Sequence, residues 1–322
     1  MKAALFKKYG SKDSIKIGES ELPEPGDTEV LIQVKATTVT AVDAIFRSGS
    51  NFFPRLATGL FSPKIRILGT ELSGVISSVG DNVSDLKLGD AVVADSGTSY
   101  GAHAEYVLLS EKEPLVKKPE SVSFEEAAAI SYGSLTALPF LRDHGEVKKG
   151  DSVLIIGASG SVGSYAVQLA KYFGAEVTGV CSTKNVSLVK SLGADHVIDY
   201  KEESLRDVMM HFDIVFDTIS KYSLGETKHL LKAEGVYLTT GLSLRSVFDM
   251  VRTGKAGKKS KLAFTGLRGN DEKKEDLKFI IELFKENRLR SVIDRAYKLD
   301  DIIAAFDYVE KGHKVGNVII TM

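Results

Sequence analysis

Three regularly spaced glycines, Gly157, Gly160 and Gly163, are the residues in this chain whose pattern most clearly points to chemistry. They follow an apolar run, Val153–Ile156, and precede a helical pattern over Tyr165–Tyr172. Glycine permits a tight turn and lets backbone N–H groups approach a pyrophosphate, and the first turn of a helix attracts negative charge. A strand, a glycine turn and a helix in this order therefore predict a dinucleotide-binding unit.

The spacing of these glycines is G-x-x-G-x-x-G, with Ala158 where the tighter G-x-G-x-x-G pattern would begin. Glycine spacing alone is weak evidence, and the predicted strand before it and helix after it supply the specificity. The alternative is a core strand–turn–helix unit that binds no ligand.

The residues after the second predicted strand of this unit bear on which dinucleotide binds. NAD-binding units usually place an acid about 20 residues beyond the first glycine, where it contacts the ribose 2′-hydroxyl. Here Val177–Lys184 contains no acid, and Ser182, Thr183 and Lys184 offer two hydroxyls and one ammonium. Such groups suit a 2′-phosphate, which a carboxylate would repel. We therefore predict NADP(H); alternatively, Ser182 only caps the next helix and Lys184 is solvated.

Length and composition are those of an ordinary globular protein. The chain has 322 residues, enough for two domains, of which 43% are hydrophobic and 26% charged. A formal net charge of −1 gives no overall attraction to nucleic acid, and no apolar run is long enough for a membrane span. The single cysteine, Cys181, excludes an internal disulfide, and the start of the chain does not resemble a signal peptide. We expect a cytoplasmic protein.

Residues 1–125 are expected to be mostly β. Short segments recur between turn signals such as Pro23, Pro25 and Gly89-Asp90. Regular short strands with glycine turns suggest a partly open barrel or a sandwich. The predicted strands are Lys2–Lys7, Glu29–Thr38, Leu72–Val79, Ala91–Asp95 and Ala104–Leu109.

From Ser123 onward the pattern changes to alternating helices and strands. Ser123 and Glu126 have the spacing of a capping box, which predicts a helix start. The alternation predicts βαβ units, with a parallel sheet covered by helices on both faces. Helices are expected over 126–131, 134–144, 165–172, 274–286 and 300–311. Strands are expected over 153–156, 176–181, 196–198, 214–217, 235–239, 261–265 and 315–321.

Motifs spread along nearly the whole chain point to one known family. They include Gly69-Thr-Glu-Leu-Ser-Gly74, Gly80-Asp-Asn-Val83, Gly101-Ala-His-Ala-Glu-Tyr106, Gly157 to Gly163, Leu192-Gly-Ala-Asp195 and Val197-Ile-Asp-Tyr200. With them the chain resembles the zinc-free quinone oxidoreductase branch of the medium-chain dehydrogenase/reductase superfamily. The resemblance implies an α/β fold. A Rossmann doubly wound parallel sheet, residues 126–266, would be inserted into a GroES-like, mostly β catalytic domain of residues 1–125 and 267–322.

The resemblance also implies cofactor contacts, position by position. The implied NADPH contacts are Thr136, Gly157, Ser159, Gly160, Ser161, Val162, Gly163, Ser182, Lys184, Tyr200, Gly241, Leu242 and Asn317. Asn317 stands where relatives often carry a lysine, so it can donate a hydrogen bond but brings no charge. Lys314, three positions earlier, could supply that charge instead.

A metal-free site is predicted from the residues that could bind zinc. Catalytic zinc is held by cysteine, histidine and carboxylate ligands, and a structural four-cysteine site is impossible with one cysteine. Zinc-dependent relatives carry a cysteine in the segment that matches Thr37–Asp43, and Gly-His-Glu where this chain has Gly69-Thr70-Glu71. The six histidines form no close pair in the sequence, so Glu71 is expected to be a structural hydrogen-bond or ion-pair partner.

The activity that the resemblance implies is hydride transfer from NADPH to a quinone or an α,β-unsaturated carbonyl. This reaction places negative charge on an oxygen, which needs a hydrogen-bond donor or a general acid, although conjugation spreads the charge. Tyr132 is the donor to test first, and we assign no general acid. Asp43 and Arg47 belong to a segment that faces the cleft in relatives; an ion pair between them is the alternative.

The apolar segment from Ser50 to Lys64, broken by Pro54, Gly59 and Pro63, is either a packed loop or a wall of the substrate pocket. We favour the second interpretation. The expected pocket residues are Asp43, Phe53, Phe61 and Tyr132.

Alternatives from other classes are a cofactor-binding redox sensor or interaction protein with little turnover, and a zinc alcohol dehydrogenase, which would contain stoichiometric zinc.

The predicted strand at 261–265 would end the sheet, and exposed sheet edges pair readily. We therefore expect a homodimer.

Overall fold

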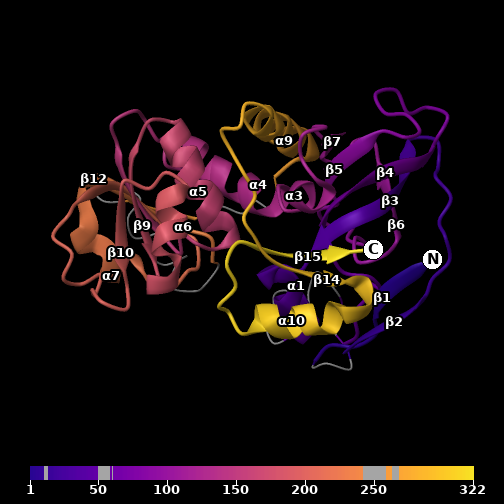
Figure 1. Cartoon of the computed structure of the whole chain (residues 1–322), viewed down its shortest axis with the longest axis horizontal. Helices are drawn as coiled ribbons and strands as arrows, with labels where there is room; N and C mark the ends of the chain where they lie inside the picture. Colours follow the sequence, from indigo (N-terminus) through magenta and orange to yellow (C-terminus); the bar gives the residue numbers. More distant parts are fainter. Residues whose placement is uncertain (11–13, 50–58, 60, 242–258, 263–267) are drawn as a thin grey trace. The chain divides into compact units, whose positions relative to one another are not determined.

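The computed structural model describes residues 1–10, 14–49, 59, 61–241, 259–262 and 268–322. They form two compact units, one of residues 1–132 with 269–322 and one of residues 133–268. Both chain ends belong to the first unit (Figure 1). The domain limits drawn from the sequence, 126 and 266, stay a prediction.

A mainly antiparallel sheet builds the first unit, in the order β14-β15-β3-β4-β5-β7. The first half of β3 also pairs with β6, and its last residues pair with β15. β15 and β14 run parallel, and β1 and β2 form a separate antiparallel pair. The strands are β1 (Lys2–Phe6), β2 (Ile15–Glu19), β3 (Glu29–Thr38), β4 (Glu71–Val79), β5 (Ala91–Asp95), β6 (Tyr106–Ser110), β7 (Leu115–Lys117), β14 (Ile293–Lys298) and β15 (Asn317–Thr321).

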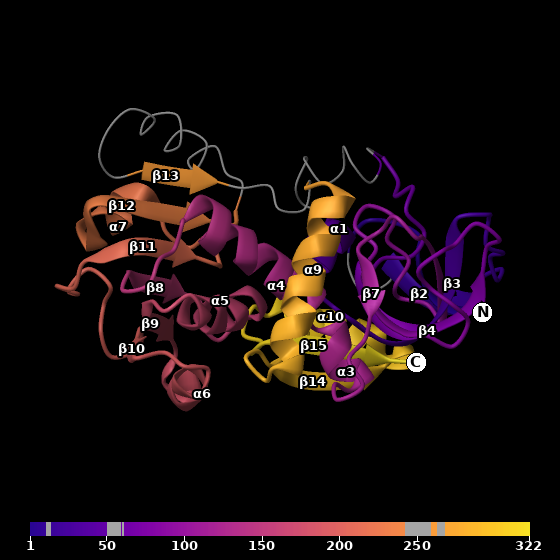
Figure 2. The same cartoon turned by 90° about the horizontal axis from the view of Figure 1, so that it is seen from above.

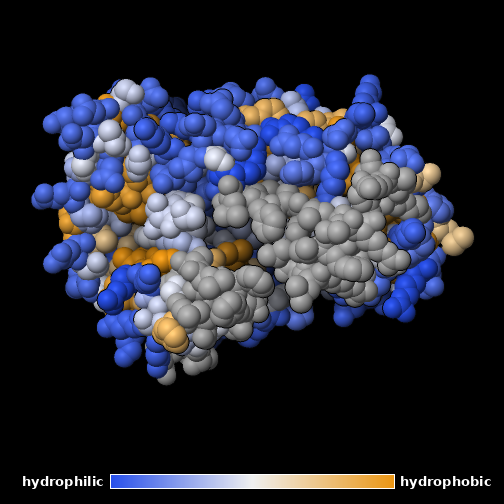
Figure 3. Space-filling view, turned by 180° about the vertical axis from the view of Figure 1, so that it is seen from behind, coloured by the Kyte–Doolittle hydropathy of each residue, from blue (hydrophilic) through white to orange (hydrophobic). Residues whose placement is uncertain are grey.

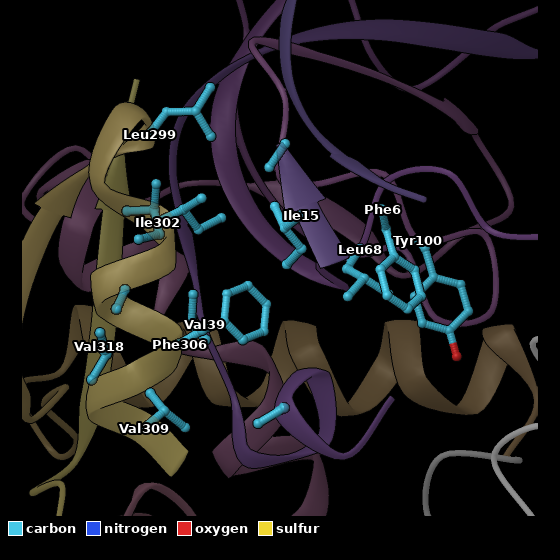
Figure 4. Close-up of a cluster of buried hydrophobic side chains, with 14 residues drawn as sticks. Phe6, Ile15, Val39, Leu68, Tyr100, Leu299, Ile302, Phe306, Val309 and Val318 are labelled. Atoms are coloured by element: carbon cyan, nitrogen blue, oxygen red, sulfur yellow. The ribbon is translucent and has the colours of Figure 1, made fainter. Parts of the chain in front are cut away.

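One apolar core of this unit joins residues from both ends of the chain (Figure 4). Phe6 and Leu68 come from its early part, and Ile302 and Phe306 from the late helix α10 (Ile302–Glu310). All four are at most 1% exposed, so their burial is a main source of stability. The other helices are α1 (Ala41–Ser48), α3 (Phe124–Ala128) and α9 (Asn270–Lys285).

Six parallel strands form the sheet of the second unit, in the order β10-β9-β8-β11-β12-β13 (Figure 2). The apolar run of β8 is fully buried near the middle of this sheet, as expected for a strand covered on both faces. The strands are β8 (Ser152–Ile156), β9 (Glu176–Cys181), β10 (His196–Asp199), β11 (Phe212–Asp217), β12 (Leu231–Thr239) and β13 (Lys259–Leu262). The helices are α5 (Ser161–Tyr172), α6 (Val186–Ser191) and α7 (Leu224–Thr227), and the chain enters the unit within α4 (Ser131–Pro139).

The predicted alternation of strands and helices is confirmed, and β3, β5 and β9 have the predicted bounds. Both hydrogen bonds of the Ser123–Glu126 capping box are present. The expected helix over 134–144 is instead the end of α4 followed by a π-helical turn, Phe140–His144. Only 261–262 of the strand expected over 261–265 lies within the described residues.

The described surface on the side drawn in Figure 3 is mainly hydrophilic, with separate small hydrophobic patches. None of the helices in the described part of the chain is long and apolar enough to cross a membrane.

Candidate active site

The glycine turn lies between β8 and α5, as predicted, and its conformation demands glycine. Gly157 has a φ of +79°, in the left-handed region that residues with a Cβ avoid. A Cβ on Gly163 would lie 2.0 Å from the carbonyl oxygen of Gly157, so this close approach of helix and strand needs glycine there. The conformation of the turn and its close packing against α5 therefore both require glycine, at Gly157 and at Gly163.

The amino end of α5 has no side-chain cap. Gly160 is its N-cap residue, and without a side chain it makes no cap hydrogen bond to the first turn. The N–H groups of Ser161, Val162 and Gly163 thus stand at the positive end of a 12-residue helix. The turn fits a pyrophosphate, because the positive end of a helix and a glycine backbone without side chains are what such a group needs.

Ser182 and Lys184 follow β9, the strand next to β8 in the sheet. Ser182 precedes a short 3-10 turn, Thr183–Asn185, but its side chain makes no cap hydrogen bond, so the capping interpretation does not hold. The side-chain amide of Asn185 donates to the hydroxyl oxygen of Ser159 at 2.9 Å, which ties this turn to the glycine turn. The Ser182 hydroxyl therefore does not serve as a helix cap.

Three other predicted cofactor residues, Thr136, Tyr200 and Gly241, lie in the same unit. Thr136 is buried in α4, Tyr200 follows β10 and is 42% exposed, and Gly241 comes shortly after β12. A Cβ on Gly241 would lie 2.3 Å from the Ser220 hydroxyl oxygen. Leu242 lies outside the described residues.

Asn317 belongs to the first unit, where it begins β15. It is 3% exposed, and its side-chain amide donates to the carbonyl of Val292 at 3.1 Å. This amide is already hydrogen-bonded to the backbone, and its contact with the cofactor stays a prediction.

A buried acid, Glu71, is hydrogen-bonded to the backbone of Tyr132 in the first unit. Glu71 begins β4, is 1% exposed, and accepts hydrogen bonds from the Thr38 hydroxyl and, at 2.6 Å, from the backbone N–H of Tyr132. Burial raises the pKa of Glu71 to about 8, against these two hydrogen bonds and with help from the charges of Asp95 and Asp43. Glu71 is thus the hydrogen-bond partner that the sequence led us to expect, and it holds the start of α4.

Two neighbours of Glu71 also have shifted pKa values. Burial, together with the charges of Glu71 and Asp43, raises the pKa of Tyr132 to about 12. The phenol therefore stays protonated at neutral pH and can donate a hydrogen bond. Burial lowers the pKa of Lys314 to about 8, against the attraction of Glu71 and Asp294, and its ammonium donates to the carbonyl of Gly316.

Asp43 and Arg47 do not form the ion pair considered from their spacing. Asp43 completes a capping box at the start of α1: its Oδ2 accepts from the backbone N–H and the hydroxyl of Thr40 at 2.8 and 2.6 Å. Arg47 is 1% exposed and instead pairs with Glu310 on α10, while its guanidinium carbon lies 4.8 Å from the ring centre of Phe306. Each residue thus has a structural partner of its own.

The structure does not place the other two expected pocket residues, Phe53 and Phe61, in a pocket. Phe61 is 92% exposed, and Phe53, with most of the segment from Ser50 to Leu60, lies outside the described residues. Their place in an apolar pocket stays a prediction.

The donor set of the described residues does not fit a metal. No group of three or more histidine, cysteine, aspartate or glutamate side chains in these ranges could hold an ion. At the Glu71 site the neighbours are the Thr38 hydroxyl and the Tyr132 backbone, which are poor zinc ligands.

Comparisons with known proteins agree with the two-unit fold described above. Residues 26–120 match the family model of the alcohol dehydrogenase GroES-like domain, and residues 192–320 match that of the zinc-binding dehydrogenases. Similar proteins include a 2-methylene-furan-3-one reductase of Solanum lycopersicum, 32% identical over 99% of this chain and 79% of that protein. An NADPH-dependent alkenal/one oxidoreductase of Arabidopsis thaliana is 31% identical over the same shares. The solved quinone oxidoreductase of Coxiella burnetii is 29% identical, with a TM-score of 0.87 over 100% of this chain and 99% of that one.

A GroES-like β unit together with a parallel sheet that carries a glycine turn defines an NAD(P)H-binding oxidoreductase. The chain belongs to the medium-chain dehydrogenase/reductase superfamily, in its quinone oxidoreductase and alkenal/one reductase branch.

Proposed function

We propose that this chain reduces a quinone or an α,β-unsaturated carbonyl with NADPH and without a metal. The observation that carries the proposal is the end of β9, where Ser182 and Lys184 offer a hydroxyl and an ammonium, with no acid from Val177 to Lys184. The names of relatives in the same branch, a quinone oxidoreductase and an NADPH-dependent alkenal/one oxidoreductase, support the substrate class.

NADPH, when bound, would supply a hydride, that is, a proton with two electrons, to an electrophilic atom of the quinone or the unsaturated carbonyl. The chain's own task is to bind the dinucleotide and to stabilise the charge that appears on the acceptor oxygen. In this proposal the N–H groups at the start of α5 hold the pyrophosphate, and Ser182 and Lys184 hold the 2′-phosphate. The protonated phenol of Tyr132 donates a hydrogen bond to the acceptor oxygen. The product then takes its proton from water.

The cofactor assignment is tested by binding NADPH and NADH separately to the wild type and to Lys184→Glu. We expect the wild type to prefer NADPH, and the variant to lose most of that preference because its carboxylate repels the 2′-phosphate. Lys190→Glu, an exposed lysine on the following helix α6, is the matched control and should keep the preference. Equal affinity of the wild type for both cofactors would refute the assignment.

The activity is tested by following NADPH oxidation with benzoquinone and with a simple alkenal. Turnover of at least one of them is expected. Tight NADPH binding without turnover of either acceptor would favour the second candidate, a cofactor-binding redox sensor or interaction protein.

We also propose that the chain forms a homodimer through β13. This strand ends the order of the parallel sheet, so one of its edges has no strand partner among the described residues. A monomer mass by light scattering would contradict this proposal.

A further inference from the structure

A cavity of about 310 Å³ lies in the second unit, between the segment that follows β10 and the loop that follows β11. Tyr200, Lys201, Lys221 and Tyr222 line it. This volume is at the lower end of the range for small-molecule sites in proteins. The cavity is large enough for part of a nucleotide.

Two ammonium groups gather at one aromatic ring in this cavity. The Nζ atoms of Lys201 and Lys221 lie 5.5 and 5.2 Å from the centre of the Tyr200 ring, and that of Lys221 is also 5.5 Å from the Tyr222 ring. The two nitrogens are therefore at most about 11 Å apart. Within the described ranges neither lies within ion-pair distance of a carboxylate, although the charge of Lys201 helps to lower the pKa of Asp199. Like charges so placed repel, and a bound anion would relieve that repulsion.

Two segments line the cavity, one after β10 and one after β11, and backbone hydrogen bonds hold both of these arms in place. The N–H of Tyr200 donates to the carbonyl of Cys181 on β9 at 3.1 Å, and the N–H of Lys201 donates to the Asp199 carboxylate at 2.9 Å. On the other arm, the N–H of Tyr222 donates to the Asp217 carboxylate at 2.8 Å. Since both arms are anchored to the sheet, the ammonium groups are presented from fixed backbone.

The position of the cavity in the fold links it to the glycine turn. Tyr200 follows β10 and Lys221 follows β11, as Ser182 follows β9 and Gly157 follows β8. These four strands are parallel, so the residues that follow them lie at the same edge of one sheet. Ligands of doubly wound sheets bind at the carboxyl ends of the strands. One extended ligand can therefore reach both places.

Glu202 and Glu203 also line the cavity, so its overall charge does not favour anions. Their presence means that a diffuse attraction for any anion is weak. What is specific is the placement of two ammonium groups around one tyrosine ring, which suits a compact anion attached to a flat base.

We propose that Lys201 and Lys221, together with Tyr200, bind the phosphate monoester on the adenosine half of the dinucleotide, and that Lys221 contributes to the choice of NADPH over NADH. The inference rests on the proposed function, since it assigns further residues to the same cofactor. It adds a second source of positive charge, from the loop after β11, to the hydroxyl and ammonium after β9.

The test compares Lys201→Gln, Lys221→Gln and the matched control Lys149→Gln. Lys149 is exposed and precedes β8, so it lies at the opposite edge of the sheet. Affinities for NADPH, NADH, adenosine 2′,5′-bisphosphate and inorganic phosphate are measured by calorimetry. We expect Lys221→Gln to weaken NADPH and the bisphosphate about five- to tenfold, equivalent to about 1 to 1.4 kcal/mol, and to leave NADH unchanged. Lys221→Arg should restore most of the loss, because it restores the charge.

The outcomes separate this inference from the proposed function. If the wild type prefers NADPH and Lys184→Glu abolishes the preference, but Lys201→Gln and Lys221→Gln bind both cofactors like the wild type, the lysine assignment is wrong and the proposed cofactor stands. Equal weakening of NADPH and NADH would mean a structural role and would also overturn it. Binding of inorganic phosphate that depends on Lys221, in a wild type that shows no preference for NADPH, would show a phosphate site unrelated to the dinucleotide and would refute the assignment to the cofactor.

Discussion

Replacing Glu71 by glutamine should change how the stability of the protein depends on pH. Glutamine has nearly the same shape and keeps an acceptor for the Tyr132 N–H, but it cannot ionise. It therefore imitates the protonated acid that burial favours in the folded protein. The comparison isolates the free energy of ionising one buried carboxyl group.

The magnitude follows from the pKa, which is raised from its ordinary value of 4.5 to about 8 in the folded protein. Between these values the folded state holds a proton that the unfolded state has lost, so the stability of the wild type falls as the pH rises. At 1.36 kcal/mol for each pKa unit, the loss relative to Glu71→Gln is at most about 5 kcal/mol at pH 8. Attraction between ionised Glu71 and Lys314 reduces this figure.

The assay is urea unfolding followed by far-ultraviolet circular dichroism, since the chain has no tryptophan, at several pH values from about 5 to about 8. Up to about pH 7, Lys314, whose own pKa is lowered to about 8, remains mostly charged in both states, so the difference between wild type and variant is taken from this part of the window. Glu111→Gln is the control. The Glu111 carboxylate also accepts backbone N–H groups, those of Asp85 and Ser84 at 2.8 Å, but at the surface, and these bonds lower its pKa.

We expect the stability of Glu71→Gln to rise relative to the wild type as the pH rises. The Glu111 variant should be less stable than the wild type by a small and nearly constant amount across this range, because above about pH 5 the carboxylate is ionised in both states and is stabilised in the folded one. A constant difference between wild type and Glu71→Gln across the window would show that Glu71 is ionised in the folded protein, and the reasoning would fail.

Three further substitutions test other parts of the structure. Gly163→Ala should abolish detectable NADPH binding or prevent folding, because the new Cβ would lie 2.0 Å from the Gly157 oxygen; Gly160→Ala, with its nearest neighbour at 3.3 Å, should fold, as circular dichroism would show. Tyr132→Phe should lower kcat about tenfold with little change in the KM for NADPH, if its phenol stabilises the acceptor oxygen; an unchanged kcat would remove it from the proposal. Ser123→Ala should cost about 1 kcal/mol in urea unfolding, because a helix loses its cap; no loss would mean that the capping box is not needed.

Local patterns accounted for much of the fold. The strands that the sequence located best, β3, β5 and β9, are buried apolar runs between turn residues, so their own composition identifies them. β14 was missed because its residues are mostly exposed or half-exposed, and it is a strand only because it pairs with β15. The helix α1 was also missed, although Thr40 and Asp43 form a capping box that could have indicated its start.

The sequence by itself determined the glycine turn, the lack of an acid after β9 and the shortage of metal ligands. Each depends on residue types a few positions apart, where backbone sterics and the chemistry of single side chains suffice. Only the tertiary structure decided that Arg47 pairs with Glu310, that Glu71 is buried beneath Tyr132, and that Lys221 lies at the Tyr200 ring. The partners in these contacts are separated by 263, 61 and 21 positions in the chain, so no local pattern records them. They arise when strands and helices pack, and burial then sets which charges the protein can carry.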